Sequence, residues 1–118
     1  MAKRGELLAV AGQIGWNARE EFESDEFLPQ FRQALRNVAA VVDAAGGTPA
    51  DIISLTLYVT DKQEYLADLP AVGAAYREVL GKHFPSMALV EVADLLEDRA
   101  RVEIQALAVL DTPESGPT

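Results

Sequence analysis

The stretch from Lys82 to Leu110 constrains the fold more than any other part of the sequence. It divides into two predicted strands joined by a short acidic connection. In the second strand, apolar and polar side chains alternate at every residue. The apolar set is Ala100, Val102, Ile104, Ala106 and Ala108, and the polar set is Arg99, Arg101, Glu103 and Gln105. Such a strand buries one of its faces. The other face either is solvated, which the pattern alone favours, or lines a polar cleft.

A strand and a helix are predicted in the first half of the chain. The run from Glu6 to Ile14 is apolar, has β character and is bounded by glycines, so it predicts a strand. From about Asp25, apolar residues recur at three- and four-residue steps as far as the pair Gly46-Gly47, which predicts a helix with a glycine stop. The expected N-cap of this helix is Ser24 or Asp25.

A second strand and helix follow. The segment from Asp51 to Asp61 is rich in β-branched residues and predicts a strand. The face expected to be apolar carries Ile53, Leu55, Leu57 and Val59. Helical spacing then runs from Tyr65 to Gly81, and Pro70 inside it must mark either a restart or a kink of the helix.

The element order β-α-β-α-β-β predicts an α+β sandwich, in which two helices cover one face of a small mixed sheet. The uncovered face would carry Ser54, Thr56 and Tyr58 beside apolar residues such as Leu107 and Val109. A partly apolar, uncovered sheet face is a candidate for self-association. We expect residues 1–111 to form a single domain and residues 112–118 to be a flexible tail.

Composition narrows the classes of function. The chain has 10 Lys and Arg against 19 Asp and Glu, a net charge of -9, which does not favour nucleic-acid binding. It contains no cysteine and a single histidine, His83, so we expect neither a metal site nor another cofactor. The opening does not resemble a signal peptide and no apolar stretch reaches membrane-spanning length, so we expect a cytoplasmic protein without a membrane partner.

Five segments, taken in order, resemble those of one family. They are AGQIG at residues 11–15, QFRQALRNV at 30–38, DIISLTLYVTD at 51–61, FPSMALVEVA at 84–93 and VEIQALA at 102–108. Each is weak evidence alone, but the ordered set is similar to the Rid family of YjgF-type reactive-intermediate deaminases, also called the endoribonuclease L-PSP family. The acidic composition gives no support to a ribonuclease activity.

The resemblance implies a chorismate-mutase-like fold and a homotrimer with a central barrel and clefts between copies. Glu103 matches the glutamate of the family, which positions the attacking water. The other cleft residues that the resemblance implies are Gly12, Gln13, Ile14, Met87, Ala88 and Leu89. Trp16, which directly follows a strand end, and Arg101, on the same strand face as Glu103, are further candidates from their positions. Family deaminases hydrolyse 2-imino acids, or enamines such as 2-aminoacrylate, to 2-oxo acids and ammonia.

Met87 is the main departure from the family pattern. It stands where the family usually has an arginine that holds the substrate carboxylate through two charged hydrogen bonds. Methionine offers neither a donor nor a charge. Losing such a contact costs on the order of 2–4 kcal/mol, a factor of about thirty to a thousand. Efficient deamination of free imino acids is therefore not expected, although backbone groups near Met87 to Leu89 would remain available.

Two further departures lie near the expected cleft. We expect the first strand of the family to be short or missing here, and the region around Pro70 to be longer than in the family by roughly one helical turn. Met87 either lines a pocket for a less charged or larger ligand, such as an aromatic one, or fills a gap in the core. Glu103 is either an acid in the cleft or a solvated partner of Arg101. Trp16 either forms a wall of the cleft or serves only to pack the fold.

Three functions remain open from the sequence. The first is a Rid-family trimer that binds a small organic metabolite without efficient deaminase activity. The second is an enamine or imine deaminase, a hydrolase, in which Arg101 supplies the missing charge. The third is a regulatory or structural trimer without catalysis.

Overall fold

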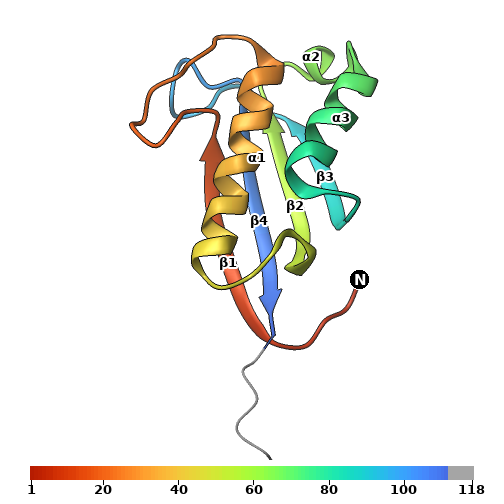
Figure 1. Ribbon diagram of the computed structural model, residues 1–118. Helices are drawn as coiled ribbons and strands as arrows, with labels where there is room; N and C mark the ends of the chain where they lie inside the picture. The colour runs from red at the N-terminus through yellow and green to blue at the C-terminus, as the bar shows by residue number, and fades with distance from the viewer. Residues whose placement is uncertain (112–118) are drawn as a thin grey trace, which may run out of the picture.

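The computed structural model describes residues 1–111, and the tail predicted for residues 112–118 lies outside the described residues. The fold is a four-stranded mixed sheet with helices packed on one face (Figure 1). In chain order, the elements are β1 (Glu6–Ile14), α1 (Phe27–Ala44), the 3-10 turn η1 (Pro49–Asp51), β2 (Ile52–Val59), α2 (Lys62–Leu66), α3 (Leu69–Leu80), β3 (Ser86–Glu91) and β4 (Val102–Leu110). The predicted order is confirmed, with the second helix divided in two.

The strands lie in the order β1-β4-β2-β3. β4 pairs antiparallel with β1 on one side and with β2 on the other, while β3 pairs parallel with β2. Because parallel neighbours need a crossover, α2 and α3 carry the chain from the end of β2 back to the start of β3. β3 is therefore an edge strand, and the connection of residues 92–101 passes over β2 to reach β4.

The core lies between the sheet and the two long helices. α1 and α3 lie side by side on this face (Figure 1). α1 directs Phe31, Leu35 and Val38 onto the sheet, and all three are buried. Burying one such side chain stabilises the fold by about 1.5–3 kcal/mol. The alternation predicted for β4 is confirmed, since Val102, Ile104, Ala106 and Ala108 are buried.

The face predicted for β2 is wrong at its first position. Leu55, Leu57 and Val59 are buried as expected, but Ile52 is buried in place of Ile53. The cause is an irregularity in the β2–β4 ladder between Ile52 and Ser54, which breaks the two-residue alternation.

The predicted N-cap of α1 is also wrong. The cap residue is Glu26, and its side chain makes no capping hydrogen bond. The carboxylate of Asp25 instead pairs with Arg99 at 2.8 Å, and the hydroxyl of Ser24 accepts the backbone N–H of Glu26. The glycine stop is confirmed, because Gly46 adopts φ 90° and the N–H of the next residue donates to a carbonyl of the last helical turn.

Pro70 marks a restart of the helix rather than a kink. α2 ends at Leu66 and α3 begins at Leu69, which places Pro70 in the first turn, where its missing N–H costs no hydrogen bond. The carboxylate of Asp68 caps the new helix by accepting the N–H of Ala71 at 3.1 Å.

The sheet face opposite the helices remains largely uncovered. Leu7 and Leu107 lie on it with exposed fractions of 67% and 37%. Val109, which was expected to be exposed there, is buried because the N-terminal segment passes close to it at Gly5. Lys3 anchors this segment through an ion pair with Asp51. Within residues 1–111, no helix has the length and apolar character needed to cross a membrane.

Candidate functional site

The residues implied for the cleft fall into two groups on different strands. One group lies where β1 meets β4 and contains Gly12 and Glu103. The other lies on the edge strand β3 and contains Met87, Ala88 and Leu89.

Glu103 lies on the uncovered face of the sheet, opposite Ile14 of β1 and Tyr58 of β2. Its carboxylate lies against the backbone of Gly12, where the β1–β4 register shifts. A Cβ atom at residue 12 would lie 2.5 Å from Glu103 Oε2, so a larger residue there would force the Glu103 side chain to move. Glu103 is partly exposed, and its carboxylate makes no hydrogen bond or ion pair with residues 1–111. It is thus free to hold a water molecule or a ligand.

Arg101 does not pair with Glu103. Its guanidinium donates to the carboxylate of Glu64 in α2 at 3.0 Å and to the main-chain carbonyl of Asp25. These partners lie at the helical side of the molecule, so the cation is already engaged away from the Glu103 carboxylate. The solvated Glu103–Arg101 pair considered from the sequence is therefore not formed.

The segment of residues 12–14 is divided between the two faces of the sheet. Ile14 shares the face of Glu103, whereas Gln13 lies opposite Ile104 and shares the core face. The Gln13 side chain donates to the carbonyl of Ala11, which bridges the irregularity in β1. Gln13 therefore cannot reach the same ligand as Glu103 within one copy.

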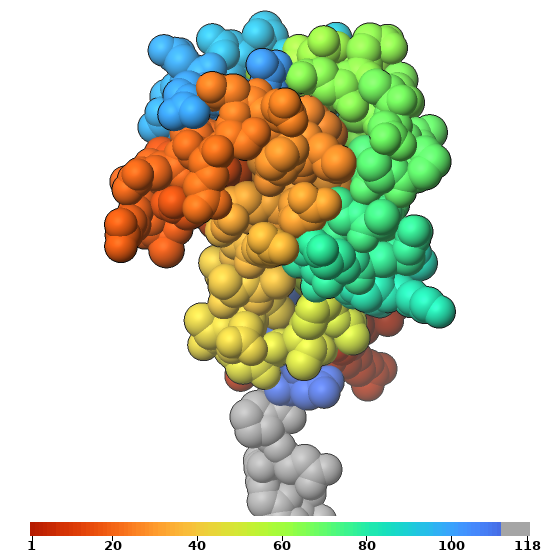
Figure 2. All heavy atoms as spheres, turned by 45° about the horizontal axis from the view of Figure 1, so that its top comes forward, coloured from red at the N-terminus to blue at the C-terminus, as the bar shows by residue number. Residues whose placement is uncertain are grey.

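Trp16 follows the end of β1 and is partly buried. Its ring packs against Phe22 at a centroid distance of 5.8 Å, and its carbonyl accepts a hydrogen bond from Asn37 at 2.8 Å. With Leu96 and Arg99 it lines an open hollow of about 410 Å³. Figure 2 shows this end of the molecule, where the segment before α1, the connection of residues 92–101 and α2 come together. Trp16 thus walls a hollow beside the Glu103 end of the sheet.

Met87 lies on the helical side of the edge strand and is 43% exposed. It pairs with Leu55 and therefore shares the core face, whereas Ala88 pairs with Thr56 and shares the face of Glu103. The N–H of Val92 donates to Val59 in β2 at 2.8 Å. Since backbone groups alternate in direction along a strand, those of Met87 and Leu89 point away from β2 toward the open edge.

Met87 and Glu103 are separated within one copy. β2 lies between their strands, so two strand spacings, about 10 Å, lie between the backbones. Their side chains also point to opposite faces of the sheet. One chain therefore cannot bring both residues to a single small ligand.

A cavity of about 200 Å³ lies beside Met87, between the helices and the edge strand. Its lining residues are Phe31, Leu57, Tyr65, Leu69, Val72, Gly73, Tyr76, Phe84 and Met87. The helical residues of this set follow the spacing from which the second helix was predicted, and a cavity beside such residues leaves no signal in that spacing. The exposed Phe84, next to Met87 in the matched segment, was the available hint.

Tyr76 forms the inner wall of this cavity. Its ring stacks on Phe84 at a centroid distance of 5.4 Å, and its hydroxyl donates to the carbonyl of His83 at 2.6 Å. Burial raises the pKa of Tyr76 to about 12. The ring of His83 is within 2.6 Å of the carbonyl of Ile52, so this histidine tethers the start of β3 to β2. No cluster suited to a metal ion occurs among residues 1–111.

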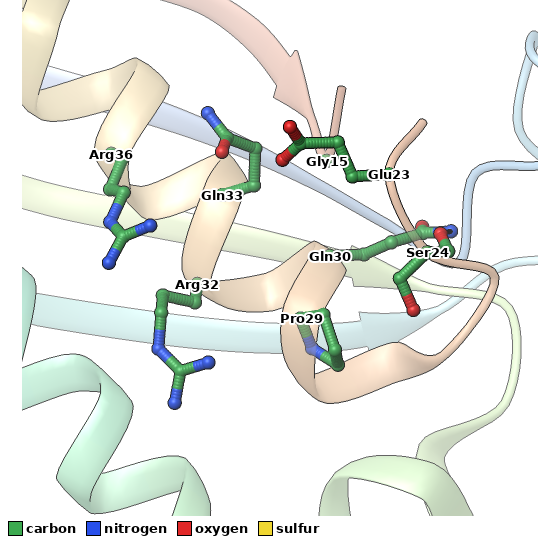
Figure 3. A pocket seen from close by; sticks show the side chains of 8 residues that line it. All are labelled: Gly15, Glu23, Ser24, Pro29, Gln30, Arg32, Gln33 and Arg36. Carbon is green, nitrogen blue, oxygen red and sulfur yellow. Dashed lines mark hydrogen bonds between the residues drawn. The ribbon is translucent and has the colours of Figure 1, made fainter. Parts of the chain in front are cut away.

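A smaller hollow of about 120 Å³ lies beside the first half of α1 (Figure 3). Its two cations, Arg32 and Arg36, both pair with Glu78 of α3, at 2.8 and 3.3 Å. Their charge is therefore partly neutralised within the chain. None of the residues implied for the cleft lines this hollow, and we do not treat it as the functional site.

Comparison with protein families matches residues 1–110 to the family described as Endoribonuclease L-PSP. The chain belongs to this family. Its members include Rid proteins such as YyfB from Yersinia pestis, whose structure aligns with a TM-score of 0.80 at 32% identity, over 90% of this chain and 80% of that one. The structure of the YjgF gene product from Escherichia coli aligns with a TM-score of 0.74 at 37% identity, over 92% of this chain and 84% of that one. The predicted Rid fold is confirmed.

A named relative of this Rid-family chain is the 2-iminobutanoate/2-iminopropanoate deaminase of Escherichia coli K12. The two are 37% identical over 108 residues, which cover 89% of this chain and 80% of the relative. The match thus extends over the whole fold rather than a single motif.

Proposed function

We propose that this Rid-family chain forms a homotrimer and binds a small organic metabolite in clefts between neighbouring copies. We further propose that it lacks efficient 2-imino acid deaminase activity. The observation that carries the second proposal is Met87, a thioether at the open edge of β3 where the family pattern has an arginine. Nothing in this side chain can bind a carboxylate.

The uncovered sheet face supports assembly. Leu7, Val90 and Leu107 lie on it with exposed fractions of 67%, 44% and 37%, between small and hydroxyl-bearing side chains. A monomer that leaves such a face in water forgoes the stabilisation that apolar burial gives. Packing the sheets of several copies against one another would bury it.

A site shared between copies is supported by the separation of Met87 and Glu103. They lie on different strands and opposite faces, so a ligand can meet both only if they come from two chains. In such a cleft, the Glu103 carboxylate would orient a water molecule toward the ligand. The outward backbone groups of Met87 and Leu89 would bind its polar end.

The energetic effect of the methionine sets the expected activity. An imino acid is already reactive toward water, so binding and positioning supply most of the rate enhancement. Without the two charged hydrogen bonds of an arginine, transition-state binding is weaker by on the order of 2–4 kcal/mol, a factor of about thirty to a thousand in kcat/KM.

An imine deaminase is the second candidate, and it is favoured by the name of the Escherichia coli relative. It requires another cation for the substrate carboxylate. Arg101 is the candidate that the sequence suggests, but its guanidinium is held by Glu64 and by the carbonyl of Asp25. Recruiting it would break both contacts, which weakens this alternative. The net charge of -9 also opposes binding of RNA.

The test is hydrolysis of 2-iminopropanoate generated in situ, followed by ammonia release. We expect the wild-type kcat/KM to be at least about thirtyfold below that of the Escherichia coli relative. Met87→Arg should raise it, because the edge position is exposed enough for a guanidinium to reach a ligand. Wild-type activity equal to that of the relative would refute the proposed loss.

Two variants test whether the gain in activity depends on the proposed cleft. Met87→Lys adds the charge without the paired donors and should recover less activity than Met87→Arg. Met87→Arg combined with Glu103→Gln should lose what Met87→Arg gained, because the carboxylate that orients water is gone. If the double variant kept the higher deaminase activity, the reaction would take place outside the proposed cleft.

A further inference from the structure

We propose that the cavity beside Met87 is a subsite for an uncharged aromatic ring, or an apolar group of that size, carried by the ligand. This proposal rests on the proposed function, in which the polar part of the ligand lies at the open edge of β3. It adds the chemical class of the ligand, because a carboxylate-sized polar substrate would leave this cavity unused.

The lining of the cavity selects against charge. None of its nine residues is charged, and three of its walls are the aromatic rings of Phe31, Tyr65 and Tyr76. Phe31 and Tyr65 meet edge to face at a centroid distance of 6.4 Å, so the cavity presents both ring faces and ring edges. The Tyr76 hydroxyl is already bonded to the carbonyl of His83 and is not available to a ligand.

The volume of the cavity suits one ring. It holds about 200 Å³ and is open on one side, and an engineered apolar cavity of about 150 Å³ binds benzene. Larger ligand sites usually enclose about 300–1,000 Å³. The cavity by itself therefore accommodates a single ring with a short substituent, and the remainder of the ligand must extend outside.

Met87 connects the cavity to the open edge. It lines the cavity and is also 43% exposed, with its backbone groups directed away from β2. Phe84, which is 63% exposed, borders the same opening. A ring between Tyr65 and Tyr76 would thus be continuous with an amide or hydroxyl group bonded to the β3 edge.

Gly73 provides a way to close the cavity without damaging the fold. The atoms nearest to a Cβ placed there belong to the guanidinium of Arg77, the closest at 3.1 Å, and this exposed side chain can move aside. Leucine has a higher helix propensity than glycine by about 0.5–1 kcal/mol, so Gly73→Leu should fill the cavity and keep α3 folded. Ala74→Leu is the matched control, because Ala74 is exposed on the same helix.

The experiment is NMR of the full chain labelled with ¹³C at the methionine methyl groups, titrated with benzamide, benzoate and acetamide. Only Met1 and Met87 give signals, so Met1 serves as the internal reference. We expect saturable ring-current shifts of the Met87 methyl with benzamide, weaker binding of benzoate and none of acetamide. Gly73→Leu should raise the benzamide Kd at least about tenfold, and Ala74→Leu should leave it unchanged.

No saturable Met87 shift, as when a side chain of a neighbouring copy fills the cavity, overturns the subsite. An equal effect of Gly73→Leu and Ala74→Leu overturns it too. If the shifts occur as expected but the wild type hydrolyses 2-iminopropanoate as fast as the relative, the subsite stands and the proposed loss of deaminase activity fails.

Discussion

Among single residues, the contact between Gly12 and Glu103 matters most for chemistry. The resemblance pointed to both residues, yet their proximity depends on the irregularity in β1 between Val10 and Gln13. No spacing rule in the sequence reveals such an irregularity. The same applies to Met87, whose position in the chain was clear but whose direction, toward the helices, depends on its pairing with β2.

Tyr76 supports a prediction about stability at high pH. Its folded pKa of about 12 exceeds the ordinary value of 10.0, so the contribution of its neutral form is complete below pH 10. That contribution is lost as the pH rises from 10 toward 12, because the unfolded phenol ionises first. Tyr76→Phe lacks the bond to His83 and should be less stable by about 1 kcal/mol at pH 7.

Urea denaturation between pH 9 and pH 11.5 checks this. The stability gap between wild type and Tyr76→Phe should narrow as the pH rises. If the free energies of unfolding of wild type and Tyr76→Phe changed with pH in parallel, the raised pKa of Tyr76 would be contradicted.

At the scale of elements, Gln30 joins α1 to the two segments at the end of the sheet. It is 1% exposed, and its amide donates to the carbonyls of Ser24 and Arg99, each at 3.0 Å. Its carbonyl accepts the N–H of Arg101 at 2.8 Å. This one side chain therefore fixes both the entry to α1 and the start of β4, from which Glu103 projects.

Gln30→Met keeps the approximate volume but leaves three main-chain groups without their partner. We expect a loss of about 2–4 kcal/mol in the free energy of unfolding, measured by urea denaturation. Gln33→Met, which removes one bond to Asn37 on the same helix, should cost less than about 1 kcal/mol. Similar losses in both variants would show that Gln30 is not a structural link.

The types and order of the elements were predictable because they follow from the spacing of apolar residues and from the glycines and prolines that end or begin a helix. Pro70 divided the second helix and Gly46-Gly47 ended the first, as local backbone chemistry requires. Two features were not predictable. The burial of Ile52 in place of Ile53 depends on how β2 pairs with β4. Asp25 does not cap α1 because it pairs with Arg99, which is distant in sequence.

For the whole molecule, the geometry of one chain leaves the proposed site in two halves. Glu103 lies on the uncovered face and Met87 at the far edge of the sheet. The sequence pattern suggested an uncovered face, but only the strand order β1-β4-β2-β3 shows that these halves are too far apart to cooperate within one copy. The central claim is that they meet across neighbouring copies.

Cross-linking between copies tests that claim most directly, since the chain contains no cysteine. Met87→Cys and Glu103→Cys proteins are unfolded, mixed, refolded and treated with a short bis-maleimide. We expect a covalent species at twice the 12.7 kDa chain mass in this mixture. We expect none in a mixture of Glu103→Cys with Ala40→Cys, which lies on the outer face of α1. A mixture that stays at the mass of one chain would contradict it.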